Sequence, residues 1–61
     1  MANEDIREKS KECGVKLWQI ADVYGITDSN FSRKLRRELS DEEKERVFRI
    51  IDTLKELNEY V

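Results

Sequence analysis

Gly14 and Gly25 are the only glycines in this chain of 61 residues, and proline does not occur at all. A sheet-rich domain of this size needs many turn residues, whereas helices joined by short turns need few. Because a glycine with positive φ commonly closes the last turn of a helix, the two glycines divide the first half of the chain into two short helices. We therefore expect residues 1–61 to form a single all-α domain with a small core.

Apolar residues at helical spacing predict four helices in this domain. Their expected ranges are about 3–13, 16–24, 28–37 and 41–58. Asn3 is a favourable N-cap for the first helix, and Thr27 for the third. Ser40 and Glu43 have the spacing of a capping box at the start of the fourth. The capping residues and the two glycines thus mark five of the eight helix ends.

The segment between the second and third expected helices has the composition of a sharp bend. Two helices that cross steeply need a small residue where their backbones approach, a residue that tolerates positive φ, and an apolar residue just after it. Ala21, Gly25 and Ile26 meet these needs in order. The apolar contacts on either side are expected from Ile20, Phe31 and Leu35. The pattern predicts a helix-turn-helix inside the four-helix domain.

Residues 14–21 and 25–33 resemble the second and third helices of the small helix-turn-helix regulators of the phage Cro and repressor type. The resemblance extends over about 14–37 and implies a sequence-specific regulator of transcription, of phage or mobile-element type. In that family the third helix enters the major groove of double-stranded DNA. At the matching positions, the base-contacting residues are Asp28, Ser29, Ser32, Arg33 and Arg36. A helical wheel independently places Ser29, Arg33 and Arg36 away from the inner face.

Three features depart from the family pattern. Gln is common in these regulators at the position that Leu17 occupies here, and Gln19 lies two residues further on. Residues 1–61 show no pattern for the usual fifth helix, and we expect an unusually tight turn between the third and fourth helices.

Positive charge is concentrated on the expected third helix, although the formal net charge of the chain is −2. Residues 14–39 contain five basic and three acidic side chains, a balance of +2. Four of the basic residues lie within 33–37, which suits several phosphate contacts and one bidentate contact from Arg to guanine. The expected phosphate contacts are Lys16, Gln19, Thr27, Asn30, Lys34 and Arg37.

The fourth helix carries more apolar surface than a small core covers, and we expect a homodimer built on this region. The candidate contacts are Phe48, Leu57, Tyr60 and Val61. A two-fold dimer would place two recognition helices roughly 34 Å apart on an inverted repeat. The alternative is that the first helix packs over the fourth and covers the same residues.

Composition excludes several other functions. With no His and one Cys, the chain lacks the residues of a Cys/His zinc site or of a Cys-His or Ser-His nucleophile. We expect no enzyme, no metal, no cofactor, no small-molecule substrate and no membrane segment, and we expect a cytoplasmic location. Trp18 is expected in the core or at its edge.

Two further functions stay open. One is a protein-interaction module that uses Trp18, Phe48 and the fourth helix. The other is an excisionase-like architectural protein that bends DNA, which would need a wing or wedge residue.

Overall fold

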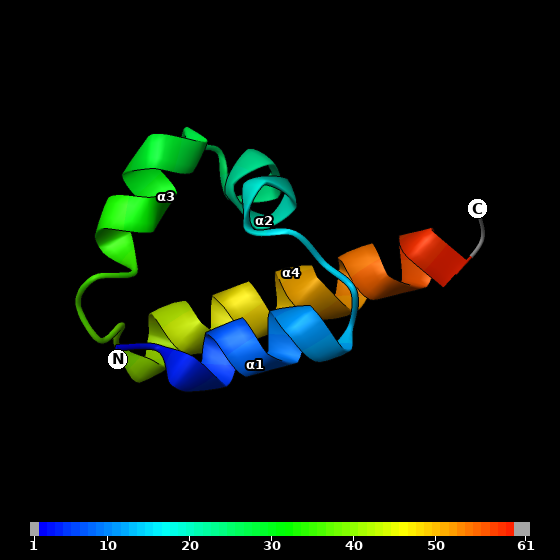
Figure 1. Cartoon of the computed structure of the whole chain (residues 1–61), viewed down its shortest axis with the longest axis horizontal. Coiled ribbons are helices and arrows are strands. Elements are labelled where there is room, and N and C mark those ends of the chain that lie inside the picture. The colour runs from blue at the N-terminus through cyan, green and yellow to red at the C-terminus, as the bar shows by residue number, and fades with distance from the viewer. Residues whose placement is uncertain (1, 60–61) are drawn as a thin grey trace.

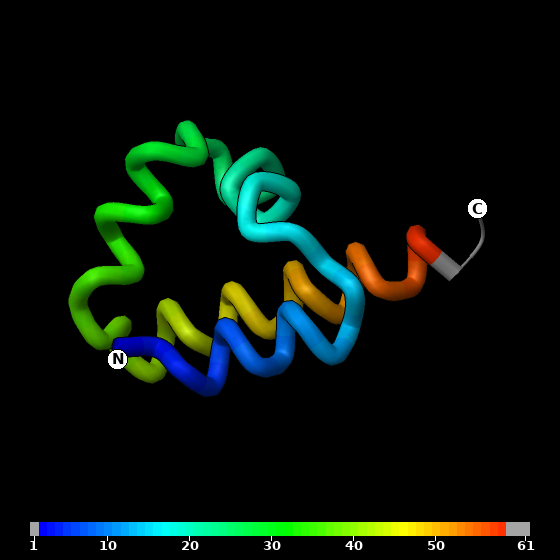
Figure 2. Tube along the Cα trace, viewed as in Figure 1, coloured from blue at the N-terminus to red at the C-terminus, as the bar shows by residue number. Residues whose placement is uncertain are grey.

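Four α-helices make up the computed structural model, which describes residues 2–59. They are α1 (Glu4–Glu12), α2 (Leu17–Tyr24), α3 (Asp28–Lys34) and α4 (Asp41–Glu59). Helices α1 and α4 lie side by side and run in the same direction, and α2 and α3 lie together across one side of them (Figures 1 and 2). Helix α2 packs against both α3 and α4. The all-α expectation is confirmed, and the bounds of the first, second and fourth helices lie within one residue of those expected.

The core lies between these two helix pairs and draws on every helix. Three of its members come from the links between helices, Val15 before α2 and both Leu35 and Leu39 before α4. Because most of the buried side chains are large aliphatic groups, each contributes about 1.5–3 kcal/mol of transfer free energy on full burial. The buried apolar residues are Ile6, Val15, Ile20, Ala21, Phe31, Leu35, Leu39, Val47, Ile51 and Leu54.

The two glycines act as expected. Gly14 has φ +67° and Gly25 has φ +92°, both in the region that L side chains rarely adopt. A Cβ atom at either position would meet nothing within 4 Å, so the constraint is the backbone conformation and not a lack of space.

Side-chain caps begin three of the helices. The Glu43 N–H donates to Ser40 Oγ at 3.3 Å, and the Ser40 hydroxyl donates to Glu43 Oε1 at 3.3 Å, which confirms the expected pairing at the start of α4. At α3 the Asn30 N–H donates to Thr27 Oγ1 at 3.2 Å, which confirms the Thr27 cap. At α2 the Lys16 N–H donates to the Gln19 side chain at 2.9 Å.

Asn3 does not cap α1 through its side chain, so that expectation was wrong. It adopts a left-handed conformation, φ 59° and ψ 36°, and is fully buried. Its Nδ2 donates to the carbonyls of Leu35, at 2.9 Å, and of Arg37, at 2.8 Å. Its Oδ1 accepts from the Leu39 N–H at 2.9 Å. The three hydrogen bonds of one buried amide thus connect the start of α1 to the link that follows α3.

The same contact explains why α3 is shorter than expected. The helix ends at Lys34 and not near residue 37, and the link to α4 spans six residues, 35–40, so the turn is not tight. The N–H groups of Arg36 and Arg37 donate three residues back, to Arg33 and Lys34, as in a tightened last turn. The carbonyls of residues 35 and 37 are bonded to Asn3 instead of continuing the helix.

Lys44 joins the same corner electrostatically. Its Nζ lies 3.0 Å from Asp5 Oδ2 and 2.7 Å from Glu38 Oε1, so one ammonium links α1, the 35–40 link and α4. The hydrogen bond from Lys44 lowers the pKa of Asp5 below its ordinary value of 3.8. The same donor, followed by the backbone N–H of Asn3, lowers the pKa of Glu38 below 4.5.

These two lowered pKa values predict a loss of stability in acid. A carboxyl with a lower pKa in the folded chain than in the unfolded chain stabilises the fold above its unfolded pKa. That stabilisation is lost as the pH falls through the folded pKa. We expect Lys44→Gln to lower the urea midpoint at pH 7, and the gap to wild type to narrow between pH 5 and pH 3. Lys55→Gln, at an exposed lysine of α4, is the matched control and should change the urea midpoint little. A difference in urea midpoint between wild type and Lys44→Gln that is as large at pH 3 as at pH 5 would contradict the prediction.

Candidate nucleic-acid interface

The bend between α2 and α3 is built from the residues that the sequence singles out. The N–H groups of Gly25 and Ile26 both donate to the Ala21 carbonyl, at 2.9 and 3.1 Å, and close the last turn of α2. Ile26 is half-buried against the core, and Phe31, in the second turn of α3, is fully buried. The bend therefore presents one side of α3 to the interior and leaves the other outside.

The outer side of α3 carries polar and cationic groups. Phe31 and the adjoining Leu35 face the core. Helical spacing puts five polar residues of α3 on the remaining arc, and all five are exposed: Asp28, Ser29, Asn30, Ser32 and Arg33. Arg36 and Arg37 are also exposed, but both lie past the end of the helix, so Arg36 does not extend the helical face as expected. The structure thus brings together four of the five expected base-contacting residues on one short helix.

Three arginines of this region have no carboxylate partner among residues 2–59. Within that range the ion pairs join Lys9 to Asp52, Lys34 to Glu43, Lys44 to Asp5 and Glu38, and Arg49 to Glu45. Arg33, Arg36 and Arg37 take part in none of them. Their guanidinium donors are available to an external anion, because the nearby carboxylates of Glu38 and Glu43 are paired with lysines.

Lys34 differs from the three arginines. Its Nζ pairs with Glu43 at the start of α4, and it lies 5.8 Å from the centre of the Tyr24 ring. The hydrogen bond to Glu43 raises the pKa of Lys34 above its ordinary value of 10.5. Arg46 of α4 lies over the same ring at 4.9 Å. A phosphate contact from Lys34 would therefore require this arrangement between α2, α3 and α4 to open.

The other expected phosphate contacts lie at the starts of α2 and α3. Lys16 is exposed and precedes α2 directly. Gln19 uses its side-chain oxygen on the Lys16 N–H, which leaves its amide nitrogen as a donor. Thr27 and Asn30 are exposed, with the Thr27 hydroxyl engaged as the cap of α3.

Trp18 is exposed, so the expectation that it lies in the core or at its edge was wrong. The inner face of α2 is filled by Leu17, Ile20, Ala21 and Tyr24, and Trp18 falls outside that stripe with 58% of its surface exposed. It lines a shallow depression beside the bend, together with Asp22, Thr27, Asp28 and Asn30. The indole thus extends the exposed surface of α3 onto α2, which helical spacing alone would have indicated.

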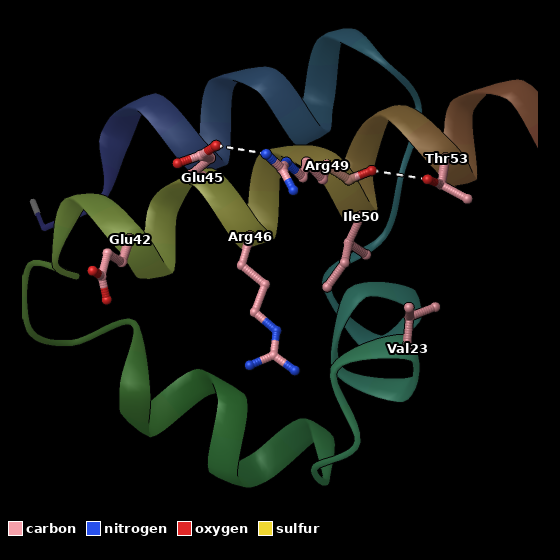
Figure 3. A pocket seen from close by; sticks show the side chains of 7 residues that line it. All are labelled: Val23, Glu42, Glu45, Arg46, Arg49, Ile50 and Thr53. Carbon is pink, nitrogen blue, oxygen red and sulfur yellow. Dashed lines mark hydrogen bonds and ion pairs between the residues drawn. The ribbon is translucent and has the colours of Figure 1, made fainter.

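A second depression lies between α2 and α4, with a volume of about 650 Å³. Figure 3 shows Arg46 pointing from α4 toward the space beside α2 and α3, with Val23 and Ile50 at the α2 side of the depression. Its other lining residues are Glu42, Glu45, Arg49 and Thr53. Val23 is 56% exposed, so this edge of the molecule keeps apolar surface outside the core.

The expected dimer contacts have different environments. Phe48 is half-buried against the core, and Lys9 of α1 lies 5.3 Å from the centre of its ring, so α1 covers part of it. Leu57 is 57% exposed, near the end of α4. Tyr60 and Val61 lie outside the described residues.

Residues 2–59 hold no cluster of three or more His, Cys, Asp or Glu side chains placed to bind a metal ion. No helix in the same range is both long and apolar enough to cross a membrane.

Comparison with known proteins identifies no relative of this chain. No family model, no curated protein and no solved structure matches it.

Proposed function

We propose that this protein binds double-stranded DNA sequence-specifically and regulates transcription, in the manner of phage and mobile-element regulators. Helix α3 would lie in the major groove, which is wide enough for one α-helix. The observation that carries the proposal is the outer face of α3 after the glycine bend, where Arg33 on the helix and Arg36 and Arg37 just beyond it are exposed and have no ion pair within residues 2–59.

The expected contacts fall into two classes. Arg33, in the last turn of α3, is suited to a bidentate contact with guanine O6 and N7, and Ser29 and Ser32 to shorter contacts with base edges. Asp28 would accept from cytosine N4 or support the positive end of α3. Arg36 and Arg37, in the link beyond the helix, are better suited to phosphates, which position a protein without carrying sequence information.

A homodimer is part of the proposal. Leu57 on α4 and Val23 on α2 each supply exposed apolar surface. Two copies related by a two-fold axis would read an inverted repeat with half-sites about one DNA turn apart. Light scattering at micromolar concentration should then give about twice the mass of the 7.3 kDa chain; the mass of a single chain would contradict the dimer.

Selection of bound duplexes from a random DNA pool is the decisive experiment. We expect an enriched palindromic sequence, and we expect its affinity to fall with salt at a log–log slope of roughly −4 to −5, as for four to six phosphate contacts. Failure to enrich any sequence, together with a flat salt response, would overturn the proposal.

A protein-interaction module is the second candidate, and the exposed apolar residues favour it. Trp18, Val23 and Leu57 are each more than half exposed. A partner protein held through such groups would bind with little dependence on salt, so the same salt titration separates the two functions.

A further inference from the structure

The corner where α1 meets α2 contains a small open cavity, of whose lining residues only Lys16 is among the expected DNA contacts. Its volume is about 290 Å³, and side chains from both helices and from the link between them line it. The lining residues are Arg7, Ser10, Lys11, Val15, Lys16 and Leu17. Three of the six are cations and none is a carboxylate, in a chain whose net charge is negative.

The three cations at this corner have no ion-pair partner among the described residues. The ion pairs within residues 2–59 use the cations of Lys9, Lys34, Lys44 and Arg49. None of these pairs involves Arg7, Lys11 or Lys16. Like charges that gather without a counter-charge raise one another's electrostatic energy. An anion bound between them would relieve that repulsion.

Unsatisfied polar atoms point to the same place. Within residues 2–59, the buried side-chain nitrogen and oxygen atoms without a hydrogen-bond partner are Arg7 Nε and Ser10 Oγ. Both belong to side chains that line this cavity, and Ser10 is only 4% exposed. Buried polar groups in folded proteins are nearly always paired, so two unpaired polar atoms on residues that line one cavity leave hydrogen-bonding capacity that a bound ligand or water would satisfy.

The start of α2 adds backbone donors. Leu17 and Trp18 are the first residues of this eight-residue helix, and their N–H groups lack the carbonyl four residues back that an interior helical residue bonds. A helix N-terminus presents such N–H groups together with the positive end of the dipole. Guanidinium, ammonium, hydroxyl and amide donors that converge from several directions suit a tetrahedral oxyanion.

We infer that the α1–α2 corner binds a phosphate group, held by Arg7, Lys11 and Lys16 with Ser10 and the first turn of α2. In the complex with DNA this group is a phosphodiester of the duplex backbone, a statement that rests on the function proposed above. Lys16 was expected to contact phosphate from the sequence, whereas the three α1 residues were not. They would add an anchor that positions α2, and through the bend α3, against the duplex.

Two measurements test the site, and Lys55→Gln on α4 is the matched control for Lys11→Gln in both. In the first, inorganic phosphate is added at constant ionic strength while amide NMR spectra are recorded. We expect saturable shifts at Leu17, Trp18 and Ser10, weakened by Lys11→Gln and unaffected by Lys55→Gln. In the second, affinity is measured for the selected duplex. Lys11→Gln should lower it roughly fivefold to tenfold at 0.1 M salt and reduce the salt slope by about 0.9, with no change for Lys55→Gln.

The outcomes separate the site from the function. Phosphate shifts without a loss of DNA affinity in Lys11→Gln would identify free phosphate as the ligand and overturn the DNA anchor. Tight DNA binding with neither effect would overturn the site and leave the proposed function intact. Phosphate shifts in a protein that enriches no duplex would remove the proposed function and keep an oxyanion site.

Discussion

Asn3→Asp should destabilise the fold by about 3–5 kcal/mol at pH 7, because it replaces the donor of two buried hydrogen bonds with an acceptor. The side chain keeps its shape, but a carboxylate oxygen would then face the carbonyls of Leu35 and Arg37, which Nδ2 now bonds at 2.9 and 2.8 Å. A domain of this length has a total stability of about 3–9 kcal/mol, so much of the population should unfold. Urea unfolding followed by circular dichroism measures the change.

Two further variants separate the hydrogen bonds from the backbone conformation. Asn3→Gly accepts the left-handed φ of 59° without strain and loses only the side-chain bonds. Asn3→Ala loses the same bonds and adds a cost of about 1–2 kcal/mol for the left-handed conformation. The expected stability order is wild type, then Gly, then Ala. If the free energy of unfolding of Asn3→Asp at pH 7 lay within about 1 kcal/mol of the wild-type value, which is the net value of one hydrogen bond, the Asn3 amide would not be what holds the start of α1 to the 35–40 link.

Arg33→Ala should weaken binding to the selected duplex by about 1–3 kcal/mol and relax the preference at one base pair. The reason is that a bidentate contact from one guanidinium to guanine carries sequence information that no neighbouring group replaces. Arg33 is exposed on α3 and takes part in no ion pair within residues 2–59, so its removal should leave the fold intact. Affinities for the selected duplex and for single-base variants of it measure both effects.

Two comparisons make the Arg33 result specific. Arg37→Ala should weaken binding to all sequences alike, as expected for a phosphate contact. Arg49→Ala removes an arginine with 79% side-chain exposure from α4, away from the proposed interface, and should change affinity little. If Arg33→Ala bound the selected duplex as tightly as Arg49→Ala does, α3 would not be the recognition helix.

Local patterns in the sequence predict most of the secondary structure. Gly14 and Gly25 stand where the chain needs positive φ, and Ser40 and Thr27 stand where helices begin. Each of these signals acts within four residues, so spacing along the chain is enough to recognise it. The apolar stripe of α2 is equally local, since helical periodicity alone predicts the burial of Ile20 and Ala21.

Local patterns do not predict where α3 ends, because a residue far away in the chain determines that end. Asn3 precedes its partners Leu35, Arg37 and Leu39 by 32 to 36 residues. Asparagine before a helix is a common N-cap, and nothing nearby distinguishes a cap from a buried bridge. Sequence patterns therefore predict an α3 that is about one turn too long, with Arg36 on its outer face.

In the candidate site, too, local sequence predicts some features, while others depend on contacts between residues far apart in the chain. Exposure of Ser29 and Arg33 follows from the wheel of α3, whereas the pairing of Lys34 with Glu43 depends on how α4 packs. The cavity at the α1–α2 corner joins two helices whose relative position no local signal predicts. The exposure of Trp18 follows from its position on α2, outside an inner face that other side chains already fill.

The exposed indole on α2 also affects how this protein can be followed in solution. Trp18 is the only tryptophan, and because it already contacts water in the folded state, its emission should change little when the chain unfolds. Any molecule that settles against the bend would instead shield it from a soluble quencher such as acrylamide. Intrinsic fluorescence in this protein is therefore a probe of docking at the surface and a poor one of denaturation.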